Sequence, residues 1–297
     1  MANKIMHWKY PKNIVSCAWL HRHLKDENIR VYDCTTYLHY TNNRSTKPYH
    51  VESGFANYKR RRIPGAAFLD IQGKFSNNKS LLNFTLPESG FLLKNLQESG
   101  VGSPFHVILY ASNALHWATR LWWLIHILGF RNVSILDGGL TEWQRLKYKV
   151  EKGESVYTPA TFQHKFDHTV FVGKDRTLHS LNDSFCVLLN ALKSDFHKGK
   201  NRRYGRAGRI PGSANIPASQ FLEKNTQKLI SPEKAFDLVR AQNIKKNTRV
   251  LNYCGGGIAA TLNAFVLRQL GIENLEIYDN SMSEWAKDYN LPIETDS

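Results

Sequence analysis

The 297-residue sequence contains few cysteines and no long apolar run, and each of these shortages argues against certain classes of protein. Its four cysteines, Cys17, Cys34, Cys186 and Cys254, include no C-x-x-C pair, which argues against a zinc knuckle, a thioredoxin-type motif and a disulfide framework. We therefore expect a reducing, cytoplasmic location, with three of the four thiols packed inertly. No apolar run approaches the roughly 18 residues of a membrane span, and segment 1–12 lacks the apolar core of a secretory signal.

Acidic residues are also few relative to basic ones. The sequence has 25 aspartates and glutamates and 40 lysines and arginines, which gives a net charge of +15. The basic residues cluster at Lys59–Arg62 and Lys198–Arg209, which a nucleic-acid partner could use. No basic helix with interleaved aromatic residues and no nucleic-acid motif accompanies these clusters. We favour a solvated basic surface that attracts small anions, and we expect neither a nucleic acid nor a membrane as a partner.

What the sequence does contain is an internal duplication, seen in three pairs of matching segments. The pairs are Arg62–Ala66 with Arg209–Ser213, Gly129–Val133 with Gly271–Leu275, and Asp137–Trp143 with Asp279–Trp285. Their order is the same in both copies, and the last two pairs are each separated by 142 positions. A period this long indicates duplicated domains rather than a solenoid of short repeats.

Each copy alternates short β-rich runs with a segment of helical length. In the first copy the expected strands are Ile29–Tyr32, Val107–Tyr110 and Val133–Leu136, and in the second they are Val187–Leu189, Thr248–Tyr253 and Leu275–Tyr278. The expected helix is Trp117–Leu128 in the first copy and Ala259–Leu270 in the second. This alternation predicts an α/β fold of two tandem domains, each a mainly parallel sheet flanked by helices. We expect the first domain over residues 1–148, a linker over 149–166 and the second domain over 167–297.

The chemistry is expected where a strand of the second copy ends at Cys254. Three glycines, Gly255, Gly256 and Gly257, follow the cysteine, and a helix begins at once. Glycines let successive N–H groups point at one spot and form a nest for negative charge, and the helix N-terminus adds partial positive charge. A thiolate held there would be a ready nucleophile. The alternative is a tight turn that happens to contain a buried cysteine.

The first copy has no such site. Aligning the strand ends Tyr110 and Tyr253 places Ala111 opposite Cys254, and the loop Ser112–His116 contains no glycine. Alanine cannot act as a nucleophile, so one copy keeps the chemistry and the other is a scaffold.

These features resemble the tandem-domain rhodanese family, which contains thiosulfate and 3-mercaptopyruvate sulfurtransferases. The resemblance covers nearly the full length and includes Val15–Leu20, both Ile-Pro-Gly turns, Arg120–Trp123 and Tyr278–Trp285. It implies two rhodanese-like domains, of which the first is inactive and the second uses Cys254 as its nucleophile. Neither a metal nor an organic cofactor is implied.

The resemblance also implies a ping-pong mechanism. The Cys254 thiolate takes sulfur from a small anionic donor, and the persulfide then gives it to cyanide, a thiol, a thioredoxin-like reductant or a sulfur-acceptor protein. The backbone N–H groups expected to hold the anionic sulfur belong to Gly255, Gly256, Gly257, Ile258, Ala259 and Ala260.

Departures from the family pattern leave the donor open. Thiosulfate-using relatives usually carry basic or small polar residues after the cysteine, whereas mercaptopyruvate-using relatives begin Cys-Gly-(Ser or Thr)-Gly, which Cys254–Gly257 approaches more closely. Ala259 stands where both groups usually carry a hydroxyl, so one hydrogen bond worth about 0.5–1.5 kcal/mol is missing. The arginines that bind the donor anion in relatives point to Arg202 here, and Lys193 is the candidate for the second position.

Two other functions compete with this one. The first is a phosphatase of the Cys-x5-Arg type. The arginine that such an enzyme needs is missing from this sequence, because the sixth residue after Cys254 is Ala260. A sulfur-relay or binding module with little turnover of small molecules is the second alternative, favoured by the departures described above.

The remaining conspicuous residues have structural interpretations. His106, His116 and His126 lack metal-ligand spacing, so no metal is expected. Asp279 and Glu284 recur as Asp137 and Glu142 in the copy without a site cysteine, so we expect them to form a turn and cap a helix. Trp143 and Trp285 are expected in the core for the same reason.

Overall fold

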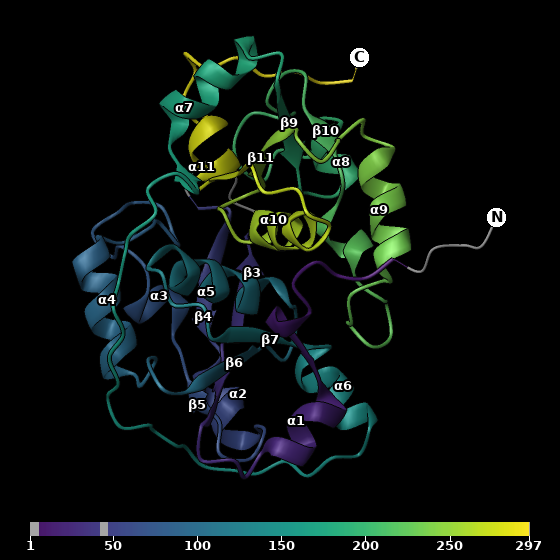
Figure 1. Cartoon of the computed structure of the whole chain (residues 1–297). Coiled ribbons are helices and arrows are strands. Elements are labelled where there is room, and N and C mark those ends of the chain that lie inside the picture. Colours follow the sequence, from purple (N-terminus) through teal and green to yellow (C-terminus); the bar gives the residue numbers. More distant parts are fainter. Residues whose placement is uncertain (1–5, 42–46, 297) are drawn as a thin grey trace, which may run out of the picture.

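The computed structural model describes residues 6–41 and 47–296, which form two five-stranded sheets and a hairpin (Figure 1). The first sheet has the order β1-β7-β6-β2-β5. Its strands are β1 (Ile14–Ser16), β2 (Ile29–Asp33), β5 (Ala67–Phe68), β6 (His106–Tyr110) and β7 (Val133–Asp137). The hairpin pairs β3 (Thr36–Tyr40) with β4 (Tyr49–Ser53) in antiparallel register.

The second sheet repeats the arrangement of the first. Its order, read from the matching edge, is β8-β12-β11-β9-β10, and every pairing in both sheets is parallel. The strands are β8 (Phe171–Val172), β9 (Cys186–Asn190), β10 (Ala214–Asn215), β11 (Arg249–Tyr253) and β12 (Leu275–Tyr278). The predicted duplication and the predicted α/β class are thereby confirmed. The edge strands of two or three residues escaped prediction because runs so short carry no usable pattern.

Helices flank both sheets (Figure 1). Around the first sheet lie η1 (Pro11–Asn13), α1 (Cys17–His23), α2 (Phe55–Arg60), α3 (Ile71–Lys74), α4 (Ser89–Glu98), α5 (His116–Ile127) and α6 (Gly139–Arg145). Around the second lie α7 (Lys174–His179), η2 (Ser180–Asn182), α8 (Ser194–His197), η3 (Ala218–Phe221), α9 (Pro232–Arg240), α10 (Ala259–Gln269) and α11 (Ser281–Trp285). We refer to the parts of the chain that carry the first and second sheets as the first half and the second half.

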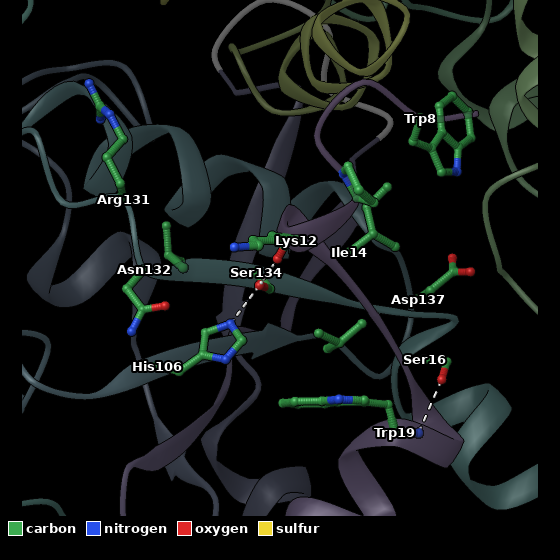
Figure 2. Close-up of a pocket in the computed structure, with 13 residues that line it drawn as sticks. Trp8, Lys12, Ile14, Ser16, Trp19, His106, Arg131, Asn132, Ser134 and Asp137 are labelled. Atoms are coloured by element: carbon green, nitrogen blue, oxygen red, sulfur yellow. Dashed lines mark hydrogen bonds between the residues drawn. The ribbon is translucent and has the colours of Figure 1, made fainter. Parts of the chain in front are cut away.

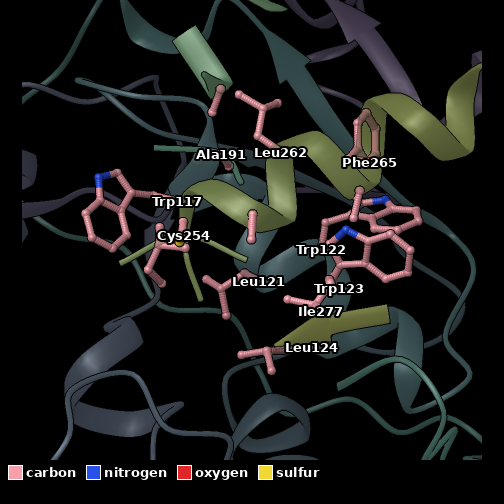
Figure 3. Packing of buried hydrophobic residues seen from close by; sticks show 14 of the residues in the cluster. Trp117, Leu121, Trp122, Trp123, Leu124, Ala191, Cys254, Leu262, Phe265 and Ile277 are labelled. Carbon is pink, nitrogen blue, oxygen red and sulfur yellow. The ribbon is translucent and has the colours of Figure 1, made fainter. Parts of the chain in front are cut away.

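The two halves meet along α5 and α10, which are buried on nearly every face. The hydroxyls of Thr119 and Thr261, 142 positions apart, hydrogen-bond to each other at 2.8 Å. Beside them, the indoles of Trp122 and Trp123 pack near Phe265 (Figure 3). Helices that are apolar all round are buried helices, which explains why these two segments lack a polar stripe.

A second pair of equivalent contacts ties the halves together. Asp137 at the end of β7 accepts the backbone N–H of Leu229 at 2.8 Å. Its counterpart Asp279, after β12, accepts the N–H of Leu86 at 2.6 Å. Neither aspartate caps a helix, since the N-cap residues of α6 and α11 are Gly138 and Asn280. The capping prediction was therefore wrong, although both residues do serve the structure.

The arginines of the two repeated Arg-Ile-Pro-Gly segments also have a structural role. Arg62 and Arg209 are buried, and each forms an ion pair with a glutamate further along the chain, Glu151 and Glu294 respectively. Each glutamate also accepts the backbone N–H of the glycine in the turn, at 2.8 Å in the first half and 2.7 Å in the second. These arginines are thus committed within the fold and are not donor-binding groups.

The segment between the halves runs along the first one. Ala160 N–H donates to Gln97 O, and Lys165 N–H donates to Leu128 O. We retain the predicted division into residues 1–148, 149–166 and 167–297 as a proposal. Trp143 and Trp285 are fully buried, which confirms their prediction as core residues. Among the helices of the described residues, none is long and apolar enough to cross a membrane.

Candidate functional site

The loop after β11 joins the central part of the second sheet to the buried helix α10. Cys254 directly follows Tyr253, the last residue of β11, and α10 begins at Ala259. Figure 3 shows Cys254 at the beginning of α10, and only 2% of the residue is exposed. The strand end therefore delivers the thiol to the N-terminal end of a helix, as the sequence predicts.

Ser281 holds this loop in place from α11. Its hydroxyl accepts the backbone N–H groups of Cys254 at 3.0 Å and Gly257 at 3.3 Å, and donates to Tyr278 O at 2.7 Å. The carbonyls of Cys254 and Gly255 accept the next two N–H groups, from Met282 and Ser283. The loop is thus anchored by a neighbouring strand-to-helix turn rather than by its own residues.

Glycine is required at Gly257. Its φ of 68° lies in the left-handed region, and a Cβ there would overlap the backbone oxygen of Asp279. Among the amides predicted to bind sulfur, that of Gly257 is the one that donates to the hydroxyl of Ser281. The amides of the other predicted sulfur-binding positions donate no hydrogen bond to another residue within 6–41 and 47–296; these positions are Gly255, Gly256, Ile258, Ala259 and Ala260.

Arg120 supports the same loop from the first half. Its side chain is fully buried and forms an ion pair with Asp279 at 2.8 Å. The guanidinium also donates to Gly257 O at 3.2 Å and Phe84 O at 2.5 Å. A buried cation of one half therefore fixes both a loop carbonyl and a carboxylate of the other.

Two tyrosines that sequence analysis did not single out cover the loop. A Cβ placed on Gly255 would overlap the phenol oxygen of Tyr204, and one placed on Gly256 would lie 2.9 Å from the phenol oxygen of Tyr49. Tyr204 belongs to the second half, whereas Tyr49 begins strand β4 of the first half. Burial raises the pKa of both phenols, with Cys254 a further contributor, so both hold their protons at neutral pH.

A cavity of about 350 Å³ adjoins this cover. Tyr204 and Ala259 line it on the loop side, and the cationic side chains Lys193 and Arg203 line it elsewhere. The guanidinium of Arg203 lies 3.6 Å from the ring centroid of Tyr40 and 4.8 Å from that of Phe196. These two cation–π contacts hold it as a fixed positive charge beside the cavity.

The predicted donor-binding residues are placed differently from one another. Lys193 lines the cavity, but Arg202 is exposed and is not among the lining residues. Its neighbour Arg203 takes that place. The segment 198–209 has no regular secondary structure, and without a period the sequence does not reveal which of two adjacent arginines faces inward.

His116 also lines this cavity. Burial lowers the pKa of its imidazole to about 4, so the ring is neutral at physiological pH and adds no charge to the site. No group of three or more potential metal ligands occurs among the described residues.

A larger cavity of about 770 Å³ is lined by residues of the first half (Figure 2), and Cys254 is not among them. Trp8 and Trp19 stand on its walls, and His106 forms a hydrogen bond with Ser134 at 2.7 Å. Burial lowers the pKa of His106. Because no cysteine lines this cavity, it offers no thiol for sulfur chemistry.

Comparison with known proteins gives consistent results. A model of the rhodanese-like domain matches residues 16–146 and 195–288. The 3-mercaptopyruvate sulfurtransferase of Escherichia coli K12 is 28% identical over 284 residues, which cover 94% of this chain and 97% of the relative. A mitochondrial thiosulfate/3-mercaptopyruvate sulfurtransferase of Arabidopsis thaliana is also 28% identical, over 95% of this chain and 78% of its own length. The crystal structure of SseA from Escherichia coli, described as a 3-mercaptopyruvate sulfurtransferase with the rhodanese fold, superimposes with a TM-score of 0.75 at 24% identity, covering 91% of this chain and 98% of the other.

Proposed function

Because the chain belongs to the rhodanese family of sulfurtransferases, we propose that it moves sulfane sulfur from a small anionic donor to a thiophilic acceptor through a persulfide on Cys254. The donor is thiosulfate or 3-mercaptopyruvate, and the acceptor is cyanide or a thiol. The observation that carries this proposal is the position of Cys254, which stands at the end of β11 among loop amides with no other partner in the described residues.

The reaction balances without a cofactor. The Cys254 thiolate attacks the transferable sulfur, so that a sulfur–sulfur bond forms while the bond from that sulfur to the rest of the donor breaks. Thiosulfate leaves as sulfite; mercaptopyruvate leaves as the enolate of pyruvate, which takes up a proton. Cyanide or a thiolate then attacks the outer sulfur, giving thiocyanate or a persulfide of the acceptor and returning the Cys254 thiolate.

The burial of Cys254 favours a small donor over a protein donor. With 2% of the residue exposed, the thiol is reached through the cover formed by Tyr49 and Tyr204, and the adjoining cavity of about 350 Å³ is of a size that admits a small molecule. A relay that receives sulfur from a protein would need this cover to open widely. We also propose the reducing, cytoplasmic location predicted above.

Mass spectrometry after donor treatment tests the proposal. The wild-type protein is expected to gain one sulfur atom from thiosulfate or 3-mercaptopyruvate and to lose it when cyanide is added, whereas Cys254→Ser gains none. Steady-state thiocyanate formation then ranks the two donors. Negligible turnover with both, together with loading by a cysteine desulfurase, would favour the relay function instead.

A matched pair of variants locates the donor anion. We propose that Arg203 and Lys193 bind it, because both line the cavity and a fixed guanidinium suits a carboxylate or thiosulfonate. Arg203→Ala is expected to raise the donor KM about tenfold, while the adjacent Arg202→Ala leaves it near the wild-type value. The reverse result would support the prediction made from sequence for Arg202.

A further inference from the structure

Three hydroxyl groups gather over the loop that carries Cys254. The phenol of Tyr204 lies against Gly255, and the phenol of Tyr49 lies against Gly256. The third is Ser283, whose Oγ would be 3.6 Å from a Cβ on Gly256. We call these three residues the hydroxyl cluster.

The hydroxyls of Ser283 and Tyr204 form no hydrogen bond of ordinary geometry with the described parts of the chain, whereas the Tyr49 phenol interacts with Ser283 and Asn83. Ser283 Oγ is buried and unpaired. The phenol of Tyr204, 8% exposed, forms no hydrogen bond with residues 6–41 or 47–296. The phenol of Tyr49, 3% exposed, is close enough to Ser283 and Asn83 for hydrogen bonding to counter part of the rise that burial causes in its pKa. Buried hydroxyls are normally paired, and an unpaired one generally marks a position where a ligand or water completes the bonding. Two such groups over one loop, with the Tyr49 hydroxyl beside them, indicate a bound atom that accepts hydrogen bonds.

The protonation and surroundings of the phenols suit an anionic acceptor. Burial raises their pKa values, which keeps both as O–H donors at neutral pH. Aromatic rings enclose them: Tyr40 and Phe84 pack against Tyr49, and Phe196 packs against Tyr204. In such an apolar setting, a hydrogen bond to an ionised group is worth more than one between neutral partners.

We propose that Tyr49, Tyr204 and Ser283 are the side-chain hydrogen-bond donors to the sulfur atom carried by Cys254, a role that rests on the proposed sulfur transfer. They replace the hydroxyl that relatives usually carry at the position of Ala259. Because Tyr49 comes from β4, the half without a nucleophile contributes directly to the active site of the other half. No proton is transferred: as the new sulfur–sulfur bond forms, negative charge shifts onto the leaving group and later onto the outer sulfur, and the hydroxyls stabilise it.

Phenylalanine variants test the cluster, since they keep the ring and remove only the oxygen. Tyr49→Phe and Tyr204→Phe are each expected to lower the rate constant of Cys254 sulfur loading by about 10- to 100-fold, as a hydrogen bond to a charged group implies. Each should also move the pH profile of Cys254 alkylation by iodoacetamide to higher pH, because the thiolate loses a donor. Ser283→Ala is expected to act in the same direction.

Tyr32→Phe is the control variant. It removes a buried phenol that donates to Ser99 O at 3.0 Å and interacts with Tyr157 and Arg30 rather than with Cys254, so it should leave both measurements unchanged. Loading rates and alkylation profiles equal to wild type in Tyr49→Phe and Tyr204→Phe would overturn the inference. The alkylation profile needs no sulfur donor, so it decides the role of the cluster even if the wild-type protein failed to accept sulfur from any donor and the proposed function were rejected.

Discussion

Each half places an equivalent backbone turn after the central strand of its own sheet, β6 in the first half and β11 in the second, yet only the turn of the second half carries a cysteine. After β6, Ala111 O accepts the N–H of Leu140, and after β11, Cys254 O accepts the N–H of Met282. The difference lies in the loop amides: Ser112 N–H is bound by the hydroxyl of Thr35 at 2.9 Å, whereas Gly255 and Gly256 leave theirs without a partner in the described residues. A strand-to-helix turn is therefore a site only where glycines and an external anchor keep its amides available.

The largest expected effect comes from exchanging the residues at the two strand ends. Cys254→Ala should lower thiocyanate formation by at least about a thousandfold, because the nucleophile is gone. The reciprocal Ala111→Cys, made in the Cys254→Ala background, should restore nothing, because its loop amides and glycines are missing. Steady-state assays of the three proteins check this, and recovered activity in the double variant would show that the loop difference is unimportant.

The other cysteines give an internal control for that experiment. Burial raises the pKa of Cys17 to about 12, that of Cys34 well above its ordinary value, and that of Cys186 as well, so all three thiols stay protonated near neutral pH and react slowly. Alkylation should therefore reveal one fast thiol in the wild type and none in Cys254→Ala.

The next largest effect concerns Arg120. Its counterpart in the second half is Leu262, because the two halves are offset by 142 positions, as Thr119 and Thr261 are. Arg120→Leu makes the first half like the second, but it leaves Asp279 with no cation and Gly257 O without its donor. Removing one partner of a buried ion pair costs about 3–5 kcal/mol. Urea unfolding should show a loss of this order, together with slower sulfur loading.

A double variant sharpens the interpretation. Adding Asp279→Asn to Arg120→Leu removes the unpaired charge, so part of the lost stability should return while sulfur loading stays slow. A loss below about 1 kcal/mol in Arg120→Leu alone would mean that the ion pair does not hold the halves together.

The contrast between halves also explains what the sequence could and could not reveal. The duplication, the main strands, α10 and the place of Cys254 at a strand end all follow from local patterns, and the structure agrees with them. Tyr49 and Arg120 carry no local signal, because they reach the loop from the other half through the packing of β4 and α5. Tyr204 lies in an irregular segment, where no period indicates which side chains face inward.

A smaller effect is expected from Asp33, the last residue of β2, whose counterpart is Asn190, the last residue of β9. These strands pair with β6 and β11 respectively. Asp33 Oδ1 accepts the N–H of Thr35 at 2.8 Å, just as Asn190 Oδ1 accepts the N–H of Leu192 at 2.9 Å in the second half. Burial raises the pKa of Asp33 to about 6. The folded protein thus holds this proton more tightly than the unfolded chain, so the associated stability is fully present below about pH 4 and is lost as the pH rises through 6.

Asp33→Asn gives the first half the neutral residue of the second. It should remove that pH dependence, which amounts to about 1–3 kcal/mol between pH 4 and pH 7 for a shift of this size. Urea unfolding of both proteins across this pH range measures the difference, with the exposed Asp26→Asn as a control. A variant curve parallel to that of the wild type would show that Asp33 ionises as easily in the folded protein as in the unfolded chain.

The smallest effect on stability is expected at Ser281, the first residue of α11. Its counterpart in the first half, 142 positions earlier, is Gly139, the first residue of α6. Both residues have left-handed backbones, with φ of 50° and 52°, a conformation that costs a non-glycine residue about 1–2 kcal/mol. Ser281→Gly relieves this strain but removes the oxygen that holds the amides of Cys254 and Gly257, so the free energy of unfolding should change by no more than about 1 kcal/mol while sulfur loading slows severalfold. Ser281→Ala keeps the strain and loses the same hydrogen bonds, and it should be the less stable of the two variants by about 1 kcal/mol. Equal stability of the glycine and alanine variants would mean that the serine is not strained, and unchanged loading in both would mean that the loop of the second half needs no anchor.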